Sequence, residues 1–228
     1  MSPTTAVLSL AMAVLALSSL QSAVALPVNS KIVQSLQCSS SPIATGQFSA
    51  QGNSGNATTL ALSSTKDDEG HQNLVNANSS QPLNVEFYAC NATIMGYNDV
   101  NGDGQQKRYG TIRVQGQDST CVIGQDGPDG SSTFIASDCS TSDDSSQFFQ
   151  FFSIESASDS SSSSSSSSNS HPQPSSRADS QQLSTVRYVR HAKEDVTAAN
   201  QFRYAITAHN ELVALQTGED NSFLEIGS

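Results

Sequence analysis

The sequence lacks the short motifs that mark common enzyme and metal sites. It has no Gly-x-Ser-x-Gly turn for a nucleophilic serine, no His-Glu-x-x-His pair and no Cys-x-x-Cys spacing. The histidines are scattered through polar segments, at His71, His171, His191 and His209. These absences predict a protein that is not an enzyme and that carries no metal or other cofactor.

Basic residues and long apolar runs are also scarce. Ten Lys and Arg face 21 Asp and Glu, so the net charge is −11. A chain this acidic is repelled by phosphate backbones and by anionic lipid, which argues against nucleic acid and membranes as partners. Beyond the first 25 residues, no segment approaches the roughly 20 apolar residues of a membrane-spanning helix.

The N-terminal segment has the pattern of a secretory signal peptide. The first 30 residues carry no charged side chain, and Ala6 to Leu17 form an apolar core. Ala23-Val24-Ala25 then supplies the small-x-small pattern that signal peptidase recognises. We expect residues 1–25 to be removed and the mature protein to be secreted to the extracellular space.

All cysteines lie in the expected mature chain, and they are Cys38, Cys90, Cys121 and Cys139. An even number of cysteines in an oxidising compartment predicts two disulfide bonds. Four cysteines allow three pairings, which the cysteine positions alone leave open.

Three Asn-x-Ser/Thr sequons agree with a secreted protein, and they begin at Asn56, Asn78 and Asn91. We expect N-glycosylation at one or more of them. The excess of Ser, Thr, Asn and Gln resembles the composition of fungal small secreted proteins.

The chain divides at a serine-rich tract. Residues 156–182 have almost no apolar side chains and include the run Ser160–Ser168, so we expect a disordered linker. Residues 183–228 are apolar again but too few to form their own core without disulfides. We therefore expect this segment to dock on residues 26–155 within one domain.

Short runs of β-branched and aromatic residues predict an all-β fold. The expected strands are 83–89, 111–114, 133–136, 148–154, 202–206 and 212–215, the last two forming a hairpin around residues 208–210. Their spacing by Gly, Asp and Asn turns is typical of a sandwich or barrel. Helical signals are few, and Ala192–Ala199 is expected to form one or two turns.

A repeated pattern narrows the fold class. A Gly-x-hydrophobic opening, a polar turn and a strand ending in Cys occur from Gly46 to Cys90 and again from Gly110 to Cys139. A third copy, without cysteines, is expected in residues 186–226. Three such copies around a pseudo-threefold axis predict a β-trefoil-like barrel of short antiparallel strands, with two copies in residues 26–155 and the third in 183–228.

One segment of this pattern resembles the ricin B-type lectin family. Cys121-Val122-Ile123, a Gly-rich turn, Cys139 and Gln147-Phe148-Phe149 are similar to the family's Cys-Leu-Asp, turn, Cys and Gln-x-Trp. The resemblance covers residues 109–152 and implies a β-trefoil with a lectin-like binding role. Together with the repeat, it implies the disulfides Cys121–Cys139 and Cys38–Cys90, each joining the beginning and end of one copy.

The residues that grip sugar in that family are replaced here. The family's carboxylate two residues after the first Cys is Ile123, and its Asn before the Gln is Ser146. Phe149 stands for the family's Trp, so we expect Gln147 and Phe149 to be framework residues, with Phe149 in the core. We expect this copy to keep its fold without binding sugar, because sugar hydroxyls against Ile123 would lack polar partners.

Three polar segments have a second interpretation. Asp99–Gly104 matches the opening of a calcium loop, but Gly110 occupies the position of the required bidentate carboxylate, which favours a hairpin turn. Gln125–Gly130 is also expected to be a turn. Lys107-Arg108 could be a processing site, and an exposed loop tip is the simpler interpretation.

Two classes of function fit these observations. The first is a secreted, non-enzymatic binding protein of lectin-like type, which recognises extracellular glycans or host or cell-wall proteins. The alternative is a secreted structural or host-interaction protein without a small-ligand site.

Overall fold

The computed structural model describes residues 34–52, 56–78, 80–98, 100, 106–126, 131–156, 183–190, 202–216 and 222–227. The expected signal peptide, the run Ser160–Ser168 and the expected helical segment Ala192–Ala199 lie outside these residues.

The prediction of an all-β protein is confirmed, because strands account for 60% of the described residues. The strands are β1 (Gln37–Cys38), β2 (Ala44–Gln51), β3 (Ala57–Leu62), β4 (Gln72–Asn76), β5 (Asn84–Ala92), β6 (Tyr97–Asn98), β7 (Lys107–Val114), β8 (Thr120–Asp126), β9 (Ser132–Asp138), β10 (Phe151–Ser156), β11 (Leu183–Tyr188), β12 (Phe202–Ile206), β13 (Leu212–Gln216) and β14 (Phe223–Gly227). A single helical turn, α1 (Gln147–Gln150), precedes β10 in the described part of the chain.

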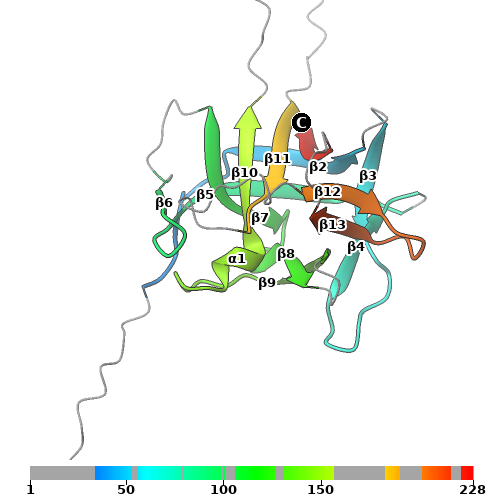
Figure 1. Cartoon of the computed structure of the whole chain (residues 1–228), viewed down its shortest axis with the longest axis horizontal. Coiled ribbons are helices and arrows are strands. Elements are labelled where there is room, and N and C mark those ends of the chain that lie inside the picture. The colour runs from blue at the N-terminus through cyan, green and yellow to red at the C-terminus, as the bar shows by residue number, and fades with distance from the viewer. Residues whose placement is uncertain are drawn as a thin grey trace, which may run out of the picture. The chain divides into compact units, whose positions relative to one another are not determined.

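The strands close into an antiparallel barrel of nine strands (Figure 1). The closed path runs β7, β10, β11, β14, β2, β3, β4, β9, β8 and back to β7. Strand β5 pairs with both β2 and β7, so it joins two strands of the barrel directly. Closure leaves the nine barrel strands with a neighbour on each side, so none of them presents a free edge at which another chain could add a strand.

Three segments of the chain share one pairing pattern. In β2–β5, β7–β10 and β11–β14, the first and last strands pair with each other, as Gly46 does with Val85 and Thr111 with Phe151. The two inner strands of each segment form a hairpin, β3–β4, β8–β9 and β12–β13. The C-terminal segment belongs to the same barrel, because β11 pairs with β10 and β14 pairs with β2.

The sequence of β5 shows how one strand contributes buried side chains to the core. Val85, Phe87 and Ala89 are buried and alternate with the less buried Glu86 and Tyr88. Because successive side chains of a strand point to opposite faces, the buried set lines the interior. Equivalent positions on strands of all three segments bury a common core, which includes Phe48, Phe87, Ile112, Phe134, Phe152, Tyr188, Leu224 and Ile226.

Aromatic rings fill the part of the core where the second and third segments meet. The Phe134 ring lies edge-on to the Tyr188 ring, with centroids 5.3 Å apart. Tyr188 also packs at 5.3 Å against both Phe152 and Phe202. Such ring pairs add stabilisation beyond the apolar area that they bury.

Both disulfide bonds expected from the repeat are confirmed: Cys38–Cys90 and Cys121–Cys139. The first attaches β1 to β5, where Cys38 and Cys90 are direct neighbours in the register. The second joins the start of β8 to the residue after β9. Two disulfides are typical of proteins that fold in an oxidising compartment such as the extracellular space.

Two local predictions are wrong. The strand expected at 148–154 begins only at Phe151, because residues 147–150 form α1. Lys107 and Arg108 do not form a loop tip but open β7, where the Lys107 Nζ lies 2.8 Å from the Glu155 Oε1 of β10. Pairing with β10 holds this dibasic segment in an extended, hydrogen-bonded strand.

Candidate functional site

The segment that resembles the lectin family folds into a hairpin followed by a helical turn. Strands β8 and β9 pair throughout, and the Cys121–Cys139 disulfide closes the open end of the hairpin. The backbone N–H of Cys139 also donates to the Ser119 carbonyl at 2.8 Å. The chain after Cys139 therefore leaves the hairpin in a fixed direction and turns into α1.

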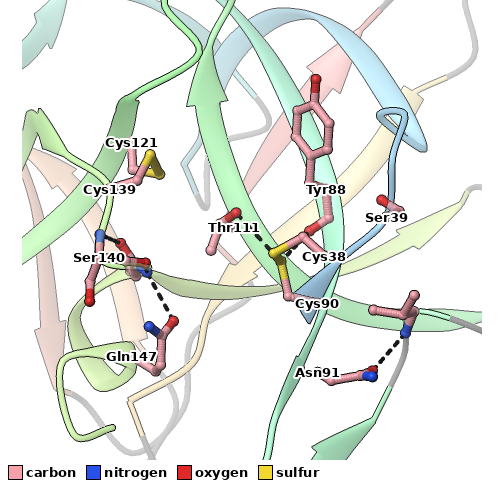
Figure 2. The surroundings of a disulfide bond; sticks show 12 residues. Cys38, Ser39, Tyr88, Cys90, Asn91, Thr111, Cys121, Cys139, Ser140 and Gln147 are labelled. Atoms are coloured by element: carbon pink, nitrogen blue, oxygen red, sulfur yellow. Dashed lines mark hydrogen bonds between the residues drawn. A yellow bond between two sulfur atoms is a disulfide. The ribbon is translucent and has the colours of Figure 1, made fainter. Parts of the chain in front are cut away.

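Two buried glutamine side chains hold α1 against the preceding loop. The Gln147 Nε2 donates to the Ser142 carbonyl at 2.5 Å. The Gln150 amide pairs twice with Ser140, because its Oε1 accepts from the Ser140 N–H at 2.9 Å and its Nε2 donates to the Ser140 carbonyl at 2.7 Å. The Gln150 Nε2 also donates to the Gln147 Oε1 at 2.9 Å, and Figure 2 shows Ser140 and Gln147 on either side of this network. Gln147 is thus buried, and both its Nε2 and its Oε1 form hydrogen bonds within the protein.

A polar turn leads into α1. The Asp144 Oδ1 accepts hydrogen bonds from the Ser146 hydroxyl at 2.6 Å and the Ser146 N–H at 2.9 Å. These bonds, the side-chain one first, hold the pKa of the Asp144 carboxyl below its usual value. The Ser146 and Ser140 hydroxyls lie 2.6 Å apart, so this chain of bonds continues to the loop below α1.

The expectation that Phe149 is a core aromatic is wrong. Its side chain is 38% exposed, while Phe151 and Phe152 are completely buried. The Gln-x-aromatic pattern recurs three residues later as Gln150-Phe151-Phe152, and the aromatic residue of this second copy is the one in the core. Phe149 belongs to the helical turn α1, whose buried residues are Gln147 and Gln150, and its own side chain lies at the surface. Phe152 belongs to β10, which follows α1 and lies in the barrel.

The exposed Phe149 ring lines a cleft of about 260 Å³ between the β8–β9 hairpin and α1. We call it the Phe149 cleft. Ile123 and Ile135 supply apolar walls, and the polar groups come from residues that include Gln125, Asp126, Ser137, Ser140 and Ser146.

Asp126 is the acidic residue among those that line the Phe149 cleft. Its Oδ2 forms an ion pair with the Arg190 guanidinium, which comes from the residues after β11. Its Oδ1 is 3.5 Å from the Ser132 hydroxyl. The Asp126 side chain remains 38% exposed. Carboxylate oxygens have several lone pairs, so Asp126 can still accept hydrogen bonds from a ligand.

The third segment of the barrel positions this cleft. The Tyr188 hydroxyl donates to the Phe148 carbonyl of α1 at 3.1 Å. Gly124 leaves the space that the Tyr188 hydroxyl occupies, since a Cβ at Gly124 would lie 2.5 Å from that oxygen. Burial raises the pKa of Tyr188, so its hydroxyl stays protonated and remains a donor.

The structure brings together some predicted site residues and leaves others apart. Ile123, Gln147 and Phe149 lie in or beside one cleft. The sequon residues Asn56 and Asn78 are exposed, whereas Asn91 is half-buried and its Oδ1 accepts from the Val100 N–H at 2.9 Å.

Two predicted turns are only partly described. Apart from Val100, the residues of the segment 99–104 lie outside the described part of the chain, as do residues 127–130 of the second turn. The prediction of a turn is wrong for Gln125 and Asp126, which are the last residues of β8 and pair with β9. No group of three or more His, Cys, Asp or Glu side chains that could hold a metal ion occurs among the described residues.

The sequence analysis did not identify two residues of the cleft, Asp126 and Gln150, or Arg190, the ion-pair partner of Asp126. A signal for Gln150 was present in the second Gln-x-aromatic pattern. Arg190 had none, because its partner Asp126 is 64 residues away along the chain.

No known protein family, curated protein or solved structure matches this chain. In the part of the chain that the structure describes, no helix has the length and apolar character needed to cross a membrane.

Proposed function

We propose that this protein is a secreted, non-enzymatic carbohydrate-binding protein, built on a β-trefoil and binding sugar in the Phe149 cleft. The β-trefoil is supported by the three segments β2–β5, β7–β10 and β11–β14, each with paired outer strands and an inner hairpin. Secretion is supported by the two disulfides and by the signal-peptide pattern of residues 1–25.

The observation that carries the binding proposal is that the partly exposed Phe149 and the partly exposed Asp126 line one cleft. The face of a sugar ring that carries C–H groups is apolar and stacks on an exposed aromatic ring. Its hydroxyls need acceptors, which Asp126 and Gln125 supply. An apolar cleft with a few placed polar groups is the usual form of a small-ligand site.

This proposal reverses the expectation drawn from Ile123. That residue lines the cleft and offers no acceptor, so the carboxylate at the family's position is indeed missing. Asp126, three residues further along β8, is a different acceptor in the same cleft. The volume of about 260 Å³ suits one sugar ring, since clefts for drug-sized ligands begin near about 300 Å³.

A glycan array tests the proposal with the secreted, glycosylated protein. We expect a defined set of glycans to be bound, and Phe149→Ala to abolish this binding. Ile94→Ala is the matched control, because Ile94 is 51% exposed and does not line the cleft. Absence of glycan binding by the unmodified protein would favour the alternative, a structural or host-interaction protein without a small-ligand site.

A further inference from the structure

A second cleft, of about 210 Å³, lies next to the Phe149 cleft and shares Ser140 and Gln150 with it. We call it the Arg113 cleft. Both disulfide bonds line it, since Cys38, Cys121 and Cys139 are all part of its wall. Figure 2 shows Thr111, another wall residue, between the two disulfides. The walls are therefore covalently tied segments, which keeps the cleft preformed.

The charge in this cleft is opposite to that of the protein. The chain has 21 acidic and ten basic residues, yet none of the described residues that line the Arg113 cleft is acidic. Among these lining residues, Arg113 is the one with a charged side chain. An anion in this cleft would therefore meet a cation directly and no carboxylate.

Arg113 has an unused hydrogen-bond donor. Its guanidinium stacks on the Tyr88 ring, with 4.2 Å from the guanidinium carbon to the ring centroid. Its Nε is buried and has no hydrogen-bond partner within the described residues. Glu86 is its neighbour in the strand register but receives the Tyr88 hydroxyl at 2.9 Å and forms no ion pair with Arg113. Because the Nε is buried, a ligand in the cleft would have to be held by the outer Nη groups of the Arg113 guanidinium.

The other polar groups of the cleft are mainly hydroxyls. Ser39, Thr111, Ser140 and Thr141 line it together with Arg113. The Thr141 side chain has no hydrogen bond among the residues that the structure describes, although its backbone carbonyl accepts from Leu36 at 2.7 Å. A ligand that fits this wall carries hydroxyl groups as well as an anionic group.

We propose that the Arg113 cleft binds a sugar acid of monosaccharide size, with the carboxylate held by Arg113 and the hydroxyls held by the Ser and Thr side chains. The planar guanidinium presents parallel N–H donors that match a carboxylate. One guanidinium balances the single charge of a carboxylate, whereas a phosphate monoester carries about 1.5 to 2 negative charges. The cleft shares Ser140 and Gln150 with the Phe149 cleft but is lined by neither Phe149 nor Asp126, so this site does not depend on the proposed function.

The test uses the full secreted protein and two probes, galacturonate and its neutral counterpart galactose. Binding is followed by NMR, with the Arg113 Nε–H signal as a reporter of a carboxylate held by the Nη groups of the same guanidinium. We expect saturable binding of galacturonate with a shift of this signal, and no such shift with galactose. Arg113→Gln should weaken galacturonate binding by at least about tenfold, the range expected for hydrogen bonds to a charged group.

Two further variants make the test specific. Lys107→Gln removes the same charge from the same strand outside the cleft, and should leave galacturonate binding unchanged. Glu86→Gln removes the negative charge next to Arg113 and should therefore strengthen the binding of galacturonate. The proposal is overturned if galacturonate does not shift the Nε–H signal of the unmodified protein, or if Lys107→Gln weakens binding as much as Arg113→Gln. Phe149→Ala should leave galacturonate binding intact, so this site and the proposed sugar site fail independently.

Discussion

The two phenylalanines at the junction of α1 and β10 allow a quantitative test of which Gln-x-aromatic copy is structural. Phe152 is completely buried and packs against Phe134 at 6.0 Å and Tyr188 at 5.3 Å. Replacing it with alanine removes the ring and leaves a sealed cavity, which costs about 3–5 kcal/mol for a core aromatic residue.

Phe149 gives a different magnitude. Its side chain is 38% exposed, so roughly three-fifths of its surface is buried. Complete burial of a phenylalanine side chain contributes about 1.5–3 kcal/mol. Phe149→Ala should therefore cost about 1–2 kcal/mol, without a cavity term because the Phe149 cleft is open to water.

Urea denaturation with the disulfides intact measures both variants. The chain has five tyrosines and no tryptophan, so tyrosine fluorescence and far-UV circular dichroism are the signals to follow. The free energy of unfolding should fall by about 1–4 kcal/mol more for Phe152→Ala than for Phe149→Ala, at an unchanged denaturant slope. Equal losses in the two variants would refute the assignment of Phe149 to the surface and of Phe152 to the core.

Three further predictions follow from particular residues. Gly110→Ala should prevent folding or lower stability severely, because the added Cβ would lie 1.9 Å from the Tyr88 carbonyl oxygen; a native-like melting temperature would contradict this. The His71 N–H donates to the Asp67 carboxylate at 2.8 Å, and this bond is the main cause that lowers the pKa of Asp67 below its usual 3.8. Because the pKa of Asp67 is lower in the folded state, its ionised carboxylate stabilises the turn above the unfolded pKa, and this stabilisation is lost as the pH falls through the folded pKa. The His71 amide signal should therefore titrate below pH 3.8. A midpoint at or above 3.8 would count against the bond. N-glycans are expected on the exposed sequon asparagines, which are Asn56 and Asn78; glycopeptide mapping that finds both unmodified would reject this.

The strand content could be predicted from the sequence because the signal is local. The alternation of Val85, Phe87 and Ala89 with polar residues requires no knowledge of the partner strands. The hairpin of β12 and β13 was predicted for the same reason, with Asn210 adopting the left-handed conformation, at φ 67°, that asparagine tolerates in turns. The disulfide pairing was predicted from the repeat and the family resemblance, although Cys38 lies on β1, before the first segment, and Cys121–Cys139 closes the inner hairpin of the second.

The prediction of a strand at 148–154 failed because side-chain hydrogen bonds favour a helical turn in its first residues. Phe148 to Ile154 is rich in aromatic residues and resembles a strand, but Gln147 and Gln150 bind the backbone of Ser142 and Ser140 and hold the first residues as a helical turn. That turn decides which phenylalanine is buried. Two Gln-x-aromatic copies are equivalent in the sequence, and only the packing of Phe152 against the rings of distant strands distinguishes them.

The sequence by itself therefore predicted the all-β class, because periodicity is a property of short segments, and the repeat together with the family resemblance predicted the two disulfide pairings. The tertiary structure alone decided the two clefts. Asp126 meets Arg190 across 64 residues, and Arg113 faces the segment around Cys38 across a still longer interval. Such groups meet only when the barrel closes, since strand pairing brings together residues that have no regular spacing along the chain.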